Sequence, residues 1–185
     1  MNKKKAIAII SKSAGITLYQ DIDGSSWLSN GYALYNMGKF PHCDSEDEVA
    51  SVLGLTEKQT VGTKITIADQ FPFDLGTMET FVGLYPANFS ITTGGRNLCI
   101  LQGESGSFGI VSAAVDSTFL KPFDLSDVTT FNAYFINNSI ALIAVVYGII
   151  TVGYICPQHI DSDHVERMIR TIRELPAEVS DDVQL

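Results

Sequence analysis

The chain has 185 residues, 45% of them apolar, and a formal net charge of −9. An apolar fraction of this size supplies a substantial hydrophobic core, which excludes a disordered chain. The acidic balance argues against a protein that attracts phosphate backbones over its whole surface, although a local basic face can coexist with it.

The N-terminus and the cysteines predict a cytoplasmic protein. Lys3–Lys5 are followed by an apolar run of only about five residues, AIAII, whereas a secretory signal peptide needs an apolar region of about 7–15 residues. Because the cysteines are odd in number and form no Cys-x-x-Cys pair, we expect reduced thiols rather than a disulfide framework. They are Cys43, Cys99 and Cys156.

The first part of the chain predicts paired strands. Residues 3–12 fit either a short helix or an initial strand. Residues 16–37 alternate apolar and polar side chains on both sides of the turn sequence DIDG, which is typical of two or more strands joined by tight turns. Within this unit the Asn30-Gly31 step indicates either a second tight turn or a bulge.

Residues 45–53 predict a helix. Ser45 followed three positions later by Glu48 matches a capping box, and Gly54 provides the stop. The acidic residues at the start of this helix favour its first turn electrostatically, so we interpret them as helix-start chemistry rather than a cation site. The buried face is expected to consist of Val49, Val52 and Leu53.

The centre of the chain predicts a β-rich domain. Between residues 63 and 116, short apolar runs such as KITIAD, FVGLY, FSITT, NLCILQ and FGIVSAAV are separated by turn-forming residues. FNAYFI, IALIAVV and IITVGYI supply three further strands, whereas Pro122 excludes a central strand position between the two sets.

Residues 140–156 raise the question of a membrane span. They carry no charge over 17 residues, which is close to the shortest stretch that can cross a bilayer as a helix. The richness in Ile and Val and the Tyr147-Gly148 step favour two buried strands joined by a turn, with Pro157 ending the second. We therefore expect no membrane association.

The chain ends in a predicted second helix and a frayed tail, residues 161–185. Asp161 or Ser162 can cap this helix, and Pro176 blocks its continuation. The overall expectation is an α+β fold, a mostly antiparallel β-sheet with two or three short helices, in which residues 1–160 form a single domain.

A glycine-rich stretch, GESGSFG, invites comparison with phosphate-binding loops. Gly103, Gly106 and Gly109 have suggestive spacing, but no Gly-Lys-Ser/Thr follows and the stretch leads into a strand rather than a helix. We interpret it as a hairpin loop and expect no bound cofactor.

Two groups of residues suggest a hydrolase. His42 and Cys43 are a base and a nucleophile, but adjacent residues rarely face each other. His159, Asp161, Asp163 and His164 carry metal-ligating atoms, although they fall where a helix cap is expected. A cysteine-dependent or metal-dependent hydrolase is thus an alternative, but we predict no catalytic residues and no bound metal.

The basic residues offer a candidate surface for nucleic acid. Three arginines spaced by three lie along one flank of the predicted C-terminal helix, where they can follow a phosphate track. The alternative is that they complement the helix dipole and pair with Glu166 or Glu174. The residues that we expect to face DNA are Arg167, Arg170, Arg173, Lys3, Lys4 and Lys5.

The stretch ITLYQDIDGSSWLSNGYALYNM resembles the repeat of DNA sliding clamps, the processivity factors of DNA polymerases. The corresponding clamp strand carries a Thr-Asp-Gly-His-Arg-Leu-type signature. Gly31 and Leu34 match it, Asn30 stands where an Asp is usual, and Tyr32-Ala33 replace His-Arg.

A second block, FNAYFINNSIALIAVVYGIITVGYICPQHI, is similar to the strands that close a clamp repeat, with Ile-Cys-Pro in place of the family's hydrophobic-Met-Pro ending. The resemblance covers residues 16–37 and 115–160, so residues 40–114 are expected to be an insertion or another half repeat. The fold-signature residues are Trp27, Asn30, Gly31, Leu34 and Pro157.

The resemblance implies a non-enzymatic, clamp-like replication protein of phage or prophage type. Its partners would be double-stranded DNA or replication proteins, and so short a chain would close a ring only as a homo-oligomer. The implied architecture is a β-sheet with helices on one face, those helices turned toward DNA. The alternative is a β-rich protein-binding module with no nucleic-acid role.

Overall fold

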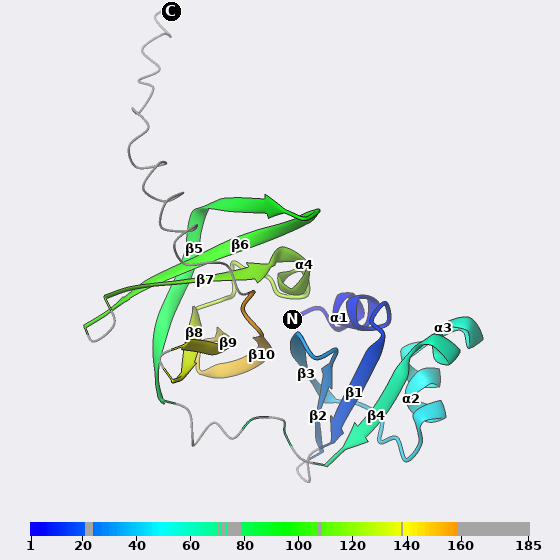
Figure 1. The fold of residues 1–185 in the computed structure, drawn as a ribbon. Coiled ribbons are helices and arrows are strands. Elements are labelled where there is room, and N and C mark those ends of the chain that lie inside the picture. Colours follow the sequence, from blue (N-terminus) through cyan, green and yellow to red (C-terminus); the bar gives the residue numbers. More distant parts are fainter. Residues whose placement is uncertain are drawn as a thin grey trace, which may run out of the picture.

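The computed structural model describes residues 1–20, 24–69, 71, 73, 79–106, 109–137 and 139–158. Figure 1 shows these residues as one continuous sheet accompanied by short helices. The predicted C-terminal helix lies outside the described residues, as do the three arginines on it, Arg167, Arg170 and Arg173.

One open sheet of ten strands organises the protein, in the order β4-β1-β2-β3-β10-β9-β8-β5-β6-β7. Only the β1–β4 pair is parallel, and every other neighbouring pair is antiparallel. The strands are β1 (Gly15–Gln20), β2 (Ser25–Ser29), β3 (Ala33–Lys39), β4 (Lys64–Ala68), β5 (Glu79–Thr93), β6 (Arg96–Ser105), β7 (Gly109–Asp116), β8 (Thr130–Ile136), β9 (Ser139–Tyr147) and β10 (Ile150–Ile155).

The expected α+β, mostly antiparallel fold is confirmed. The described residues contain four short helices where two or three were predicted: α1 (Lys3–Ile10), α2 (Glu46–Leu53), α3 (Glu57–Gly62) and α4 (Ser117–Leu120). The ambiguous residues 3–12 form α1 rather than a strand. Helix α3 was missed although Thr56 and Gln59 form a complete capping box. A helix of six residues has too little periodicity to be recognised from its pattern.

One detail of the strand prediction was wrong. FVGLY and FSITT were expected to be separate strands, but both belong to β5, whose pairing with β6 shifts register between Pro86 and Ser90. Pro86 stands at this irregularity and does not end the strand. Such irregular positions are among the places where sheets tolerate a proline.

Residues 140–156 form β9 and β10, joined at Tyr147-Gly148 as predicted. Gly148 adopts φ 61°, a left-handed conformation that glycine supplies at a tight turn. Within the described ranges, none of the helices combines the length and apolar content that a membrane crossing requires.

Two units of the same topology meet at the centre of the sheet. Each is a short helix followed by a three-stranded antiparallel meander: α1-β1-β2-β3 and α4-β8-β9-β10. Their third strands pair antiparallel, with Tyr154 opposite Leu34, and their helices α1 and α4 are in contact. Antiparallel pairing of equivalent strands gives the two units an approximate two-fold relation that the amino-acid sequence does not reveal.

The main core lies between the sheet and its helices. Ala6 and Ile10 of α1, Val49 of α2 and Leu120 of α4 belong to the same buried cluster as Phe131 of β8. Three helices therefore cover one face of the sheet. A second cluster contains Leu34, Leu142 and Tyr154 but no residue of a described helix, so it belongs to the other face.

Candidate functional site

Helix α1 presents an unusual arrangement of charge. Asn2 caps it by accepting a hydrogen bond from the Lys5 backbone N–H at 3.1 Å. Its first turn consists of the exposed residues Lys3, Lys4 and Lys5, with no acidic residue. Cations at a helix N-terminus oppose the helix dipole and usually occur at the other end. The arrangement is unfavourable for the helix itself, and such local conflicts are characteristic of functional surfaces.

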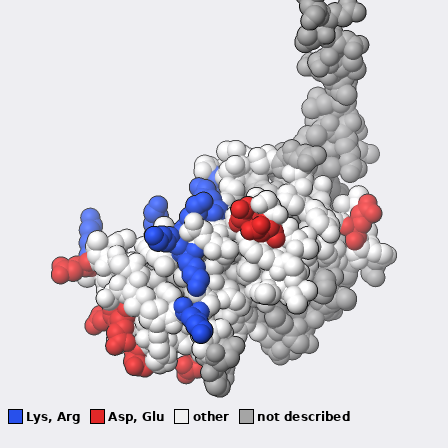
Figure 2. Space-filling model, turned by 180° about the vertical axis from the view of Figure 1, so that it is seen from behind, with Lys and Arg blue, Asp and Glu red and all other residues white. Residues whose placement is uncertain are grey.

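Further lysines extend this basic surface beyond α1. Figure 2 shows the Lys and Arg side chains of one face gathered in a band, while most acidic side chains of that face lie toward the end that carries α2 and α3. The ammonium group of Lys3 lies beside Gly38, because a Cβ added to that glycine would be 3.4 Å from Lys3 Nζ. Lys39 is the next residue along the chain. We define the lysine band as the exposed lysines on and around α1: Lys3, Lys4 and Lys5 in its first turn, Lys12 just after its end, Lys39 next to the Gly38 that Lys3 approaches, and Lys121, which lines a surface hollow together with Lys5.

This hollow, of about 510 Å³, lies along the band between the start of α1 and the loop after α4. Its lining includes Lys5, Lys121, Phe123 and Asp124. Hydrogen bonds from Ser126 to the Asp124 carboxylate lower the pKa of Asp124, which therefore keeps a negative charge at the rim. The hollow is thus mixed in charge, and the uninterrupted positive charge lies on α1.

The band lysines make no ion pair within 4.0 Å among the described residues, where His42 and Asp44 form the one such pair, at 3.1 Å. Asp124 shares the lining of the hollow with Lys5 and Lys121 but forms no ion pair with either. The positive charge of the band is therefore available to an external anion.

Two of the fold-signature residues, Asn30 and Gly31, shape the turn between β2 and β3. Gly31, at φ 85°, completes the tight turn between β2 and β3, so the turn alternative for Asn30-Gly31 is correct. The Asn30 Oδ1 atom accepts hydrogen bonds from the N–H groups of Tyr32 and Ala33 at 3.0 and 2.9 Å. An asparagine side chain that bonds the backbone two residues ahead is a usual way to build such a turn.

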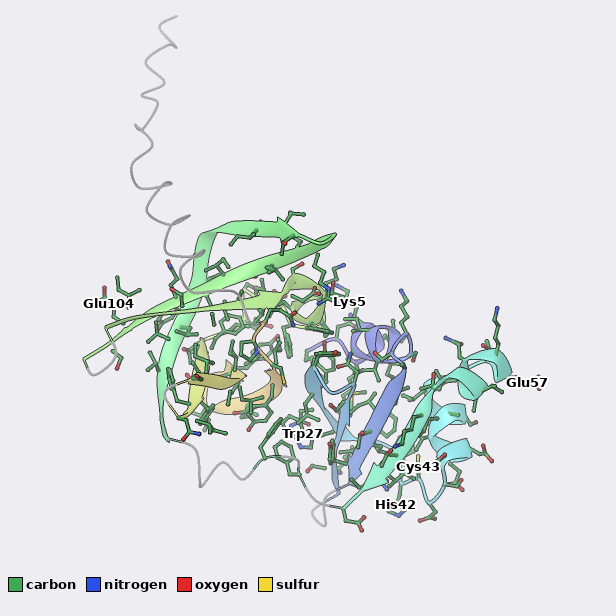
Figure 3. All side chains as sticks on the ribbon, in the orientation of Figure 1. Lys5, Trp27, His42, Cys43, Glu57 and Glu104 are labelled. Atoms are coloured by element: carbon green, nitrogen blue, oxygen red, sulfur yellow. The ribbon has the colours of Figure 1, made fainter. Side chains whose placement is uncertain are left out.

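The remaining signature residues hold the sheet together. Trp27, labelled in Figure 3, has its ring centroid 5.3 Å from that of Phe71 and 5.6 Å from that of Tyr154, on the face that no described helix covers. Leu34 is buried in the same cluster, and Pro157 follows β10. Their assignment as marks of a clamp-like fold stays a prediction.

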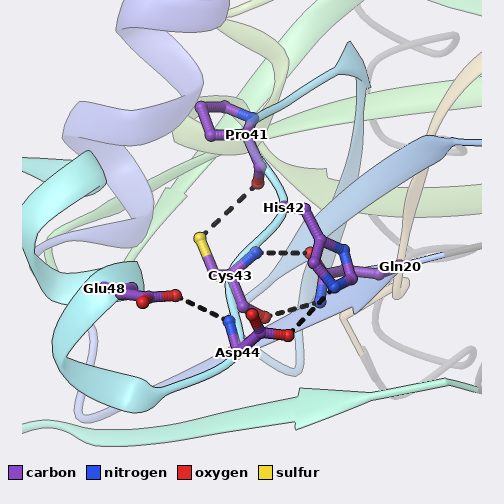
Figure 4. A network of polar contacts seen from close by, with 6 residues as sticks. All are labelled: Gln20, Pro41, His42, Cys43, Asp44 and Glu48. Atoms are coloured by element: carbon purple, nitrogen blue, oxygen red, sulfur yellow. Dashed lines mark hydrogen bonds and ion pairs between the residues drawn. The ribbon is translucent and has the colours of Figure 1, made fainter.

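Cys43 does not have the geometry of a nucleophile (Figure 4). Its thiol is 1% exposed and donates a long hydrogen bond to the Pro41 carbonyl at 3.5 Å. The imidazole of His42 pairs with Asp44 instead of the thiol. Burial, followed by the charges of Glu48 and Asp44, raises the pKa of the Cys43 thiol. A catalytic cysteine needs a lowered pKa.

Hydrogen bonds from neighbouring side chains hold the backbone around Cys43 in place. The Gln20 side-chain amide donates to the Cys43 carbonyl at 2.8 Å and accepts from the Cys43 N–H at 2.9 Å. The Glu48 side chain accepts from Asp44 N–H at 2.7 Å, not from the capping residue Ser45 as the capping box predicted. Ser45 still accepts from Glu48 N–H at 3.3 Å. The network joins β1 to the start of α2.

We expect Cys43 to react slowly with thiol reagents. A raised pKa keeps the thiol protonated at pH 8, and burial blocks access, so alkylation should be at least about tenfold slower than in urea-unfolded protein. Mass-spectrometric peptide mapping over time measures this, with the partly exposed Cys99 and Cys156 as internal references. Faster labelling of Cys43 than of both references would contradict this structure of the site.

The described part of the glycine-rich stretch includes the end of β6 and the start of β7, which pair as an antiparallel hairpin, so the predicted loop is shorter than the stretch. Gly103 lies within β6, where a Cβ would collide with the Gly83 carbonyl of β5. This glycine is required for close strand packing rather than for phosphate binding.

Metal binding has no candidate in the part of the chain that the structure describes, since no three His, Cys, Asp or Glu side chains come together there. The residues proposed from sequence, His159, Asp161, Asp163 and His164, lie outside it.

In comparisons with known proteins, no protein-family model, curated protein or solved structure matches the chain. The assignment of a site therefore depends on the geometry of this chain.

The lysine band contains residues that the sequence interpretation missed. Lys39 and Lys121 are far from α1 in sequence and come close to it only through tertiary packing, since Gly38 lies beside Lys3 and Lys121 lines the same hollow as Lys5. A second missed feature is the ring pair of Tyr32 and Phe119. The unusual lysines at the start of α1 were the signal that pointed to this surface.

Proposed function

We propose that the protein is a non-enzymatic, sliding-clamp-like DNA-binding protein that acts in replication. The observation that carries this proposal is the lysine band. Six exposed lysines without ion pairs among the described residues lie on and around α1, in a chain whose net charge is −9. A local cluster of this kind attracts phosphates through counterion release even on an acidic protein.

The arrangement of helices supports the same proposal. The clamp resemblance implies a sheet with helices on one face and with those helices turned toward DNA. In this protein α1, α2 and α4 cover one face, and α1 carries three of the band lysines. The two stretches that resemble the clamp repeat contain the strands of the two helix–meander units. This agreement supports a repeated architecture.

The sheet is open at β4 and β7, so ring closure would require further copies of the chain. Light scattering on a sizing column measures the solution mass. A defined oligomer supports the clamp form of the proposal, whereas a monomer restricts the protein to DNA binding without encirclement.

Replacing Lys3, Lys4 and Lys5 together by Gln is expected to weaken DNA binding at least about tenfold at low salt. The slope of log K against log salt should fall by about 1 for each lysine that contacts a phosphate. Fluorescence anisotropy with a labelled duplex, titrated at several salt concentrations, measures both quantities. The lysines are exposed, so the fold should be retained.

Lys58 provides a matched control. It is also an exposed lysine in the first turn of a helix, α3, but it does not belong to the band. Lys58→Gln should leave affinity and salt slope close to those of the unmodified protein, while Lys4→Gln alone should lower both. If Lys4→Gln and Lys58→Gln changed affinity and salt slope equally, the band lysines would contribute no more to DNA binding than any other surface lysine. Unchanged binding by the triple variant would end the assignment.

A protein-binding module is the second candidate, and β7 favours it. This strand is at the edge of the sheet, where on the side away from β6 Ala114 alone is bridged, to Gln158, among the described residues, and its residues 109–115, GIVSAAV, include no charge and no proline. Natural edge strands usually carry such residues to prevent pairing with other chains. Indifference of the protein to DNA, together with a stable monomer, would favour strand addition by a protein partner.

A further inference from the structure

Tyr32 is an aromatic side chain with an unusual setting on the turn between β2 and β3. Its side chain is 59% exposed, and its ring is nearly parallel to that of Phe119, at an interplanar angle of 12° and a centroid separation of 6.2 Å. Phe119 belongs to α4 and packs against the main core. At this separation the two rings are offset rather than face to face, so Phe119 lies beside the tyrosine ring, which remains largely open to solvent.

Hydrogen bonds hold the backbone of both Tyr32 and Phe119 in place. Tyr32 N–H donates to Asn30 Oδ1 at 3.0 Å, and the Tyr32 carbonyl accepts from Cys156 N–H at 2.8 Å. The carbonyl of Phe119 accepts a hydrogen bond from the buried Tyr35 hydroxyl at 3.0 Å. A flat group that stacks on Tyr32 would therefore meet a surface whose backbone is already ordered, which lowers the entropic cost of binding.

The pair also lies close to the lysine band. The Asn30 side-chain amide donates to Ser13 Oγ at 3.0 Å, which ties the turn to the residue directly after Lys12. On the other side, α4 contacts α1 and ends at Lys121. Figure 1 shows α1 and α4 as neighbours on the same side of the sheet. An extended phosphate backbone on the band would bring its bases within reach of Tyr32.

A basic track beside an exposed aromatic ring is the combination that binds single-stranded nucleic acid. The lysines hold the phosphates, and the ring stacks on a base of any identity. A base within a duplex has both faces covered by neighbouring bases, so it has no free face on which Tyr32 could stack. The positions of Tyr32 and of the lysines thus favour an unpaired strand over a duplex at this location.

We infer that Tyr32, which lies beside Phe119, is a stacking platform for an unpaired base of a nucleic-acid strand bound along the lysine band. This inference rests on the proposed function, because the band must first bind phosphates. It deepens that proposal by naming the ligand: a single-stranded segment, as occurs where a duplex ends.

The test uses the full chain and a labelled oligothymidylate of about 12 nucleotides, within the range of known single-strand sites. Tyr32→Ala should weaken its binding roughly 5- to 100-fold, the effect of losing one stacked base. Tyr32→Phe should bind like the unmodified protein, because stacking needs the ring and not the hydroxyl. Binding of a blunt duplex should be the same for all three proteins.

Tyr85 serves as the matched control. It lies on β5, is 61% exposed, and has no ring contact among the described residues. Tyr85→Ala should leave oligothymidylate binding unchanged, which separates stacking at Tyr32 from a general effect of removing an exposed tyrosine. Far-ultraviolet circular dichroism of both variants checks that the fold is kept.

The possible failures are distinguishable. If Tyr32→Ala binds oligothymidylate normally while the triple lysine variant does not, the stacking platform is refuted and the DNA-binding proposal stands. If Tyr32→Ala weakens duplex and oligothymidylate equally, Tyr32 supports the surface and does not stack on a base. If the unmodified protein binds neither probe, both proposals are overturned.

Discussion

Gly103→Ala is expected to lower the free energy of unfolding by about 3 kcal/mol or more. An added Cβ at this position would collide with the Gly83 carbonyl oxygen and approach Leu84 Cδ2 at 3.0 Å and Gly83 C at 3.1 Å. Overpacking in an ordered core typically costs about 1–3 kcal/mol, and occasionally more. The obstruction here is backbone of β5, which is paired on both sides and cannot rotate away as a side chain does.

Urea denaturation followed by circular dichroism measures this loss, and Gly106→Ala is the matched control. Gly106 lies in the same glycine-rich stretch, but an added Cβ there meets nothing within 4 Å and its φ is not positive. Alanine should then be neutral or slightly stabilising, since it restricts the unfolded chain. A Gly103→Ala protein as stable as Gly106→Ala would mean that β5 and β6 are not packed as described.

Gly153→Ala is expected to destabilise the protein by about 1–3 kcal/mol, for a different reason. A Cβ at Gly153 would lie 2.5 Å from Phe123 Cζ and 3.0 Å from the Leu34 carbonyl oxygen. Phe123 is buried and its ring is 5.6 Å from that of Tyr35. The phenylalanine therefore crosses β10 at the one point where the strand has no side chain, beside the junction of the two helix–meander units.

A second substitution tests this explanation. Phe123→Leu removes the atoms that meet the new methyl group, so the double variant should lose less stability than the sum of the two single losses. Residues in direct contact typically show interaction energies of about 0.5–3 kcal/mol in such a cycle. Strict additivity would show that Phe123 is not what excludes a side chain at Gly153, leaving the Leu34 carbonyl as the obstruction.

Short-range chemistry explains the parts of the fold that were predicted correctly. The Ser45 cap and the left-handed Gly54 begin and end α2 with contacts inside the helix and its flanks. The turns at Asn30-Gly31 and Tyr147-Gly148 need only a residue that tolerates positive φ. Each signal lies within a few residues, so the sequence is sufficient to find it.

The candidate site could be predicted only in part. Lys3, Lys4 and Lys5 were proposed from sequence because they are consecutive, and they do form the start of the lysine band. The arginines proposed with them, Arg167, Arg170 and Arg173, lie outside the described residues, so their role stays a prediction. The other band lysines carry no local signal, since their neighbours in sequence are those of ordinary surface residues.

The sequence by itself determined the α+β class, the main turns, α2 and most strands, because these depend on apolar periodicity and on glycine or capping residues at fixed short distances. Only the tertiary structure decided that β3 pairs with β10, that Gly103 and Gly153 must lack side chains, and that Tyr32 lies beside Phe119, 87 positions later in the chain. Those contacts join residues far apart in sequence, and their partners are fixed by how the two units pack together rather than by any local pattern.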